Sequence, residues 1–122
     1  MQFLLVMAGG AIGAGARHLF GRAALAALGP GYPYGTLGVN LLGGLLMGLL
    51  AGVLPRGGNE GLRLFAGVGV LGGFTTFSAF SLDAVLLWEQ GRAGAALGYV
   101  LLSVVGSLTA LALGLRIARA VA

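Results

Sequence analysis

The sequence predicts an all-α integral membrane protein with four transmembrane helices, and three observations support this prediction. Of the 122 residues, 58% are hydrophobic and only 8% are charged. The mean hydropathy is +1.01, and a soluble domain carries about 25% charged residues, so this chain has too few for a surface that faces water. Four apolar segments reach the roughly 20 residues that a helix needs to span a bilayer. These helices are expected over 3–28, 35–54, 63–88 and 95–115, as a single domain covering 1–122.

The first segment is expected to stay in the membrane. It lacks the basic region of a signal peptide, and Arg17 and His18 stand where a small-residue cleavage site would lie. Turn-rich separators follow the first three segments: GPGYP (29–33), PRGGNE (55–60) and EQGRAG (89–94). Because these separators are short, neighbouring helices must run antiparallel, and both termini must lie on the same side.

The third segment contains the run GVLGGFTTFSAF (69–80), in which two glycines and two threonines interrupt an apolar helix. Gly72 and Gly73 weaken a helix because glycine loses more backbone freedom than other residues when it becomes ordered. Non-helical backbone at membrane depth is tolerated only where it is buried in protein or lines a cavity. We therefore expect the third helix to be broken at its centre, with carbonyl groups that need a partner.

Arginine counts predict a dual-topology antiparallel homodimer. The side that holds the termini carries Arg56, Arg63, Arg116 and Arg119, and the other side carries Arg17, Arg22 and Arg92. The count for the other side assumes that Arg17 and Arg22 lie in the final turns of the first helix. Four against three is a weak positive-inside bias, which indicates insertion in both orientations. The alternative is that a few residues fix one orientation.

Small residues recur at four-residue spacing in the apolar segments. Gly44, Gly48 and Gly52 form such a stripe in the second segment. Stripes of this kind let helix backbones approach closely in lipid. They predict close helix packing within the chain, an oligomer interface, or both.

Composition excludes or disfavours several functions. The chain has no cysteine, so disulfides, thiolate metal sites and cysteine nucleophiles are excluded. His18 is the single histidine and no nucleophile motif accompanies it, so an enzyme is not expected. The arginines form no basic run with interleaved aromatic residues, so nucleic acid is not expected as a partner.

A proton-coupled exporter of the small-multidrug type is the alternative function, and a purely structural membrane subunit is a third. An exporter of that type needs a carboxylate near the membrane midplane. The first, second and fourth segments have none between their ends, and Asp83 lies close to Glu89 at the end of the third. The sequence therefore disfavours the exporter.

The remaining polar groups at membrane depth favour a path for an anion. Asn40 offers an amide, while Tyr99, Ser103 and Ser107 follow one another at i, i+4 and i+8 on one helix face. Hydroxyl groups rotate and donate to whatever passes. The alternative is that the serines bond to their own helix or to a neighbouring one. Three hydroxyls in register favour the path.

Three segments resemble the signature segments of the Fluc/CrcB fluoride channels: GGAIGAGARH (9–18), YGTLGVNLLGG (34–44) and GVLGGFTTFSAFS (69–81). The resemblance covers the whole chain in length, helix number, motif order and spacing. It implies a passive fluoride-selective channel that exports fluoride from the cytoplasm across the inner or plasma membrane and so protects against fluoride toxicity. It also implies an antiparallel homodimer with two pores and a structural sodium ion at the dimer interface.

The resemblance also implies roles for individual residues. The implied fluoride-pore residues are Asn40, Phe77, Phe80, Tyr99, Ser103 and Ser107. The main-chain carbonyls of Gly72 and Thr75 would bind sodium. Arg17, Thr36 and Ser78 are candidate pore or vestibule residues, and Arg17 has the least defined role. Ala79 and Asp83 depart from the family pattern, which has threonine and glutamate there, and we expect neither to touch the ion path.

The residue chemistry agrees with an anion path. Backbone donors are committed inside helices, so side-chain donors must replace the water shell of a small, strongly hydrated anion. Aromatic rings carry a positive edge, and Phe77 and Phe80 share a helix face at i, i+3. Ordinary packing is the alternative role for these two rings. Several moderate contacts suit conduction better than one tight site.

Overall fold

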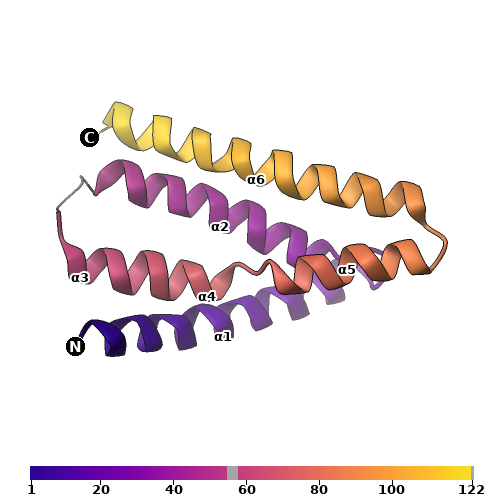
Figure 1. Cartoon of the computed structure of the whole chain (residues 1–122), viewed down its shortest axis with the longest axis horizontal. Coiled ribbons are helices and arrows are strands. Elements are labelled where there is room, and N and C mark those ends of the chain that lie inside the picture. The colour runs from indigo at the N-terminus through magenta and orange to yellow at the C-terminus, as the bar shows by residue number, and fades with distance from the viewer. Residues whose placement is uncertain (55–57, 122) are drawn as a thin grey trace.

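The computed structural model describes residues 1–54 and 58–121, which fold into four long antiparallel helical spans (Figure 1). Both termini lie at the same end of the molecule. The elements are α1 (Gln2–Leu28), α2 (Tyr34–Val53), α3 (Glu60–Leu62), the π-helix η1 (Arg63–Leu71), α4 (Gly72–Phe74), α5 (Ser78–Glu89) and α6 (Ala93–Val121). Elements α3 to α5 together make the third span. All four spans are long and apolar enough to cross a membrane, which confirms the prediction of an all-α protein with four such helices.

The loops at the end opposite the termini depend on glycine. Gly29 and Gly91 have φ angles of 81° and 77°, in the left-handed region where a side chain would be strained. Arg92 Nη1 donates to the Gly31 carbonyl at 2.7 Å, so the two loops at this end are joined. At the other end, Asn59 Oδ1 accepts from the Leu62 amide and caps α3.

Helix α6 ends six residues later than the predicted boundary at residue 115. The prediction stopped where arginines interrupt the apolar run. The helix continues because Arg116 and Arg119 are good helix formers, as are Ala118 and Ala120 beside them. A charged residue ends an apolar span without ending the helix.

Glycine seams hold the helices together within the chain. A Cβ atom added to Gly48 of α2 would meet the α6 backbone at Leu111 and Leu115, and one added to Gly114 of α6 would meet α2. A second seam joins α1 to the third span, where the Gly69 and Gly9 backbones come together. Small residues therefore set the helix spacing on both sides of the bundle.

Most large apolar side chains face outward, as suits a chain surrounded by lipid or by another chain. One buried cluster is built from Phe80, Leu87, Ala96 and Tyr99, where α5 meets α6. This cluster lies toward the end that holds Gly29 and Gly91, and it supports the residues of the candidate site.

The third span changes its backbone geometry between α4 and α5. Gly72 keeps helical angles (φ −62°, ψ −39°), and α4 ends at Phe74. Thr75 is extended (φ −85°, ψ 160°), and α5 begins at Ser78. The departure from helix geometry therefore follows the glycine pair by a few residues and falls on the threonines.

One assumption behind the arginine count is wrong. Helix α1 continues to Leu28, so Arg17 lies eleven residues before its end and not in its final turns. Setting Arg17 aside leaves two arginines, Arg22 and Arg92, against the four predicted for the side of the termini, of which Arg56 lies outside the described residues. The arginine counts on the two sides are therefore less balanced than predicted, and they give less support to dual topology.

Candidate functional site

A cavity of about 440 Å³ lies between α2, the start of α5 and α6. Five of the six predicted pore residues line it: Asn40, Phe77, Phe80, Ser103 and Ser107. They come from three spans that are far apart in the sequence, so the fold brings them together. The sixth, Tyr99, is fully buried on α6 and lies next to this cavity. Its ring centroid is 5.3 Å from that of Phe80.

The two phenylalanines have different surroundings. The ring centroids of Phe77 and Phe80 are 5.5 Å apart, with their planes inclined at 51°. Phe80 is only 8% exposed and is packed against Tyr99, whereas Phe77 is 76% exposed. Phe80 is therefore held by this chain alone, and Phe77 projects beyond the chain's own packing.

Ser103 carries an unusual hydroxyl. The residue is 5% exposed, and its Oγ atom is buried without a hydrogen-bond partner among the described residues. A buried polar group without a partner costs about 1–3 kcal/mol. Because Ser103 also lines the cavity beside Asn40 and Phe80, a ligand with acceptor capacity in that cavity could satisfy this hydroxyl.

Side chains replace helical hydrogen bonds where α4 gives way to α5. The Thr76 amide donates to Asn40 Oδ1 at 2.9 Å, and Asn40 Nδ2 donates back to the Thr76 carbonyl at 3.0 Å. The Ala79 amide donates to Thr76 Oγ1 at 3.1 Å. In a continuous α-helix, these two amides would instead bond to the carbonyls of Gly72 and Thr75, the predicted sodium ligands.

A second cavity, of about 360 Å³, is lined in part by two arginines of α1. Arg17, His18 and Arg22 line it together with Thr36 and Thr76. Arg17 Nε donates to the Gly73 carbonyl at 3.2 Å, so its charge lies beside the end of α4. A positive charge is stabilised near the C-terminal carbonyls of a helix.

The structure separates the three candidate vestibule residues. Arg17 and Thr36 line the same cationic cavity. Ser78 is exposed, and its hydroxyl lies 3.3 Å from that of Thr76. Ser78 therefore contacts the connection between α4 and α5 and not the other two residues.

The expectation that Asp83 stays clear of the predicted ion path is wrong. The Tyr99 hydroxyl donates to Asp83 Oδ2 at 3.2 Å, so this carboxylate contacts one of the assigned pore residues. Sequence analysis missed the pair because it placed Asp83 by its distance from Glu89 along one helix. The signal lay in the turn at Gly91, which folds α6 back against α5.

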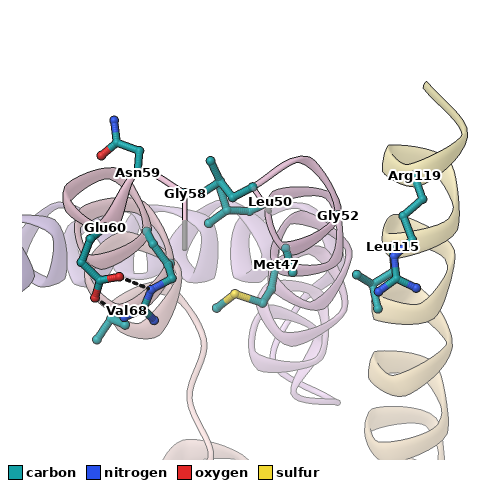
Figure 2. A pocket seen from close by; sticks show the side chains of 13 residues that line it. Met47, Leu50, Gly52, Gly58, Asn59, Glu60, Val68, Leu115 and Arg119 are labelled. Atoms are coloured by element: carbon teal, nitrogen blue, oxygen red, sulfur yellow. Dashed lines mark hydrogen bonds and ion pairs between the residues drawn. The ribbon is translucent and has the colours of Figure 1, made fainter. Parts of the chain in front are cut away.

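Another cavity, of about 700 Å³, lies near the other end of the molecule, and its described lining contains none of the predicted pore residues. Figure 2 shows its lining, in which the apolar side chains of Met47 and Leu50 extend from α2 toward the third span and Leu115 belongs to α6. Glu60 and Arg63 form an ion pair at its edge, drawn dashed in Figure 2. The polar groups of the first cavity therefore mark the better candidate site.

The fold and the site define a multi-pass helical membrane protein with a largely apolar cavity that Asn40, Ser103 and Ser107 also line. Residues 4–115 match the family described as "CrcB-like protein, Camphor Resistance (CrcB)". The chain belongs to this family.

Three relatives are named fluoride-specific ion channel FluC. The one from Mesorhizobium japonicum is 53% identical over 119 residues, which cover 97% of this chain and 96% of the relative. The one from Sphingopyxis alaskensis is 57% identical, covering 93% and 92% of the two chains. The one from Chelativorans sp. is 56% identical and covers 98% of each chain. The predicted resemblance to the Fluc/CrcB family is confirmed.

Proposed function

We propose that this protein is a passive fluoride-selective channel, and not an enzyme, that lets fluoride leave the cytoplasm and so protects against fluoride toxicity. The names of the relatives support fluoride as the ion. The observation that carries the proposal is the unpaired Ser103 hydroxyl in a cavity that Asn40 and Phe80 also line. The protein acts in the inner or plasma membrane.

The residues of the cavity supply contacts suited to a small hydrated anion. Asn40 and the hydroxyls of Ser103 and Ser107 replace water molecules as hydrogen-bond donors. Phe80 and Phe77 offer ring edges, where aromatic groups carry partial positive charge. None of these contacts is as strong as a fixed cation, so an anion can bind and leave. The cationic cavity of Arg17 and Arg22 attracts the anion from water.

The working unit in this proposal is an antiparallel homodimer with two pores. Two features of the single chain support it. Phe77 of the candidate pore is 76% exposed, and Gly72 is exposed on the chain surface. A second chain crossing at this level would cover both. Four helices of this length also enclose too little volume to form a pore by themselves.

A structural sodium ion at the dimer interface fits the carbonyls of Gly72 and Thr75. The amides that would occupy these carbonyls in a helix are bonded to Asn40 and Thr76 side chains. Main-chain carbonyl oxygens suit alkali cations, as they do in selective filters. When bound, the ion supplies a positive charge to carbonyl dipoles that lack helical partners.

Fluoride efflux from liposomes tests the proposal, with chloride efflux as the control. We expect fluoride to leave without a proton gradient and chloride to be retained. Proton-coupled drug movement would instead support the exporter, and absence of any flux would favour a structural subunit.

Two substitutions test the pore assignment. Phe80→Ile and Asn40→Asp should each abolish fluoride flux while the dimer still assembles, because one removes a ring edge and the other places a negative charge in the cavity. Leu46→Met, at an exposed position of α2 outside this lining, should conduct normally. Full flux in both Phe80→Ile and Asn40→Asp would contradict the assignment.

Exchange of sodium for a large organic cation tests the sodium site. Dimer stability and fluoride flux should both fall in sodium-free buffer. Unchanged values for both would remove sodium from the proposal and leave the anion path intact.

A further inference from the structure

The Asn40 carboxamide is paired with a single peptide group. Its oxygen accepts from the Thr76 amide, and its nitrogen donates to the Thr76 carbonyl. Both distances, 2.9 and 3.0 Å, are those of good hydrogen bonds. The side chain therefore binds the Thr76 peptide as a neighbouring strand would, although it projects from helix α2.

This pairing decides how α4 ends. Gly72 has helical dihedral angles, so its carbonyl points toward the position of the Thr76 amide in a continuing helix. The Thr75 amide still makes its helical bond to the Leu71 carbonyl at 3.0 Å. The next amide, that of Thr76, is the first to leave the helical pattern, and it does so by bonding to Asn40.

Asn40 also reaches the proposed anion path. Its carboxamide nitrogen has two hydrogens, and the Thr76 carbonyl uses one. The side chain lines the same cavity as Phe80 and Ser103. One carboxamide thus contacts the cavity and, through one peptide group, controls the availability of the Gly72 carbonyl.

We propose that Asn40 is a positioning residue for the Gly72 carbonyl: by holding the Thr76 peptide, it keeps the α4 helix from closing over that oxygen. This inference rests on the proposed sodium site at Gly72 and Thr75. It gives Asn40 a second role beside anion contact and links the cation site to the anion path through one side chain.

The experiment compares Asn40→Leu, which removes both hydrogen bonds and keeps the branching at Cγ, with Asn40→Asp, which keeps the acceptor for the Thr76 amide. Leu46→Met, at an exposed position of the same helix, serves as the control. The isotopically labelled full-length protein is studied by NMR in micelles, first in sodium-free buffer and then during titration with sodium chloride. The readouts are the carbonyl carbon shift of Gly72 and the through-hydrogen-bond coupling of the Thr76 amide nitrogen.

In the wild type, the Thr76 amide should couple to the Asn40 side-chain carbonyl carbon. In Asn40→Leu without sodium, this amide should couple to the Gly72 carbonyl carbon, whose shift should move. Sodium must then displace the hydrogen bond from the Thr76 amide to the Gly72 carbonyl. Each protomer that contributes this carbonyl should therefore lower the sodium affinity about fivefold. Asn40→Asp should keep the coupling of the Thr76 amide to the side-chain carbonyl carbon, and it should not lose sodium affinity because its negative charge attracts the cation, even though it lacks fluoride flux.

Coupling of the wild-type Thr76 amide to Gly72 would overturn the proposal without any variant. A wild-type Gly72 shift and sodium affinity in a folded Asn40→Leu protein would also overturn it. If sodium leaves the wild-type spectrum unchanged, the proposed sodium site fails. The sodium-free coupling and shift still decide the role of Asn40 in that case.

Discussion

Substitution of Gly48 by alanine should force α2 and α6 apart. The new Cβ atom would lie 2.9 Å from the Leu111 carbonyl carbon and 3.0 Å from the Leu115 nitrogen, with the Leu111 oxygen closer still. Ordinary contact begins at 3.4 Å, and because the oxygen is the nearest of the three atoms, the helices must separate by more than about 0.5 Å. Because the obstructing atoms belong to a helix backbone, they cannot rotate away.

The cost of this separation follows from two opposing effects. Overpacking costs about 1–3 kcal/mol, and a rigid backbone obstacle places Gly48→Ala at the upper end. Alanine gains about 1 kcal/mol over glycine in a helix. The net loss in the free energy of unfolding should therefore be about 2 kcal/mol.

Gly98→Ala is the matched control on α6. No atom lies within 4 Å of the position that its Cβ would take, so only the gain from helix propensity remains. The two variants should differ by about 3 kcal/mol in the free energy of unfolding, measured by denaturant titration in micelles. If Gly48→Ala were as stable as Gly98→Ala, the close contact between α2 and α6 would be refuted.

Three further changes test other parts of the structure. Burial, aided by the neighbouring Tyr34, raises the pKa of the Tyr32 hydroxyl above its ordinary value of about 10. The neutral phenol is thus favoured in the folded state, so thermal stability should fall as the pH rises above 10, and Tyr32→Phe should flatten that fall. Tyr99→Phe keeps the buried ring but removes the hydroxyl that donates to Asp83. The free energy of unfolding should fall by about 1–3 kcal/mol in denaturant titration, and fluoride efflux should be slower. Wild-type values for both would contradict the hydrogen bond. Gly91→Ala should lower the free energy of unfolding by about 1 kcal/mol, and with it the midpoint of thermal unfolding, because the φ of 77° at this position suits glycine. An unchanged midpoint would contradict that turn.

The four helices and the shared face of Ser103 and Ser107 were predictable from local patterns. Apolar length alone places four spans, since a membrane helix needs about 20 such residues wherever it lies in the sequence. The four-residue spacing places Ser103 and Ser107 on one face of α6, and both line the cavity with Asn40. These inferences needed no knowledge of how the helices are paired.

What could not be predicted depends on the register between helices. The bond from Tyr99 to Asp83 joins residues 16 apart, and it requires α5 and α6 to pair at one particular register across the Gly91 turn. The two hydrogen bonds between the Asn40 side chain and the Thr76 backbone join residues 36 positions apart, and no periodicity of α2 predicts them. Composition indicated that the third span would be irregular, but only packing determined which peptide leaves the helix.

The bond from Arg17 to the Gly73 carbonyl has a consequence for the synthesis of the chain. The two residues are 56 positions apart, and ribosomes add about 5–20 residues per second. The partner of Arg17 is therefore made about 3–11 s after the arginine itself. A charge at the centre of an inserting helix costs about 2.5–3.5 kcal/mol. The first span thus enters the membrane at a higher free energy, which falls only when the third span inserts and supplies the Gly73 carbonyl. The insertion of the two spans is therefore coupled in time.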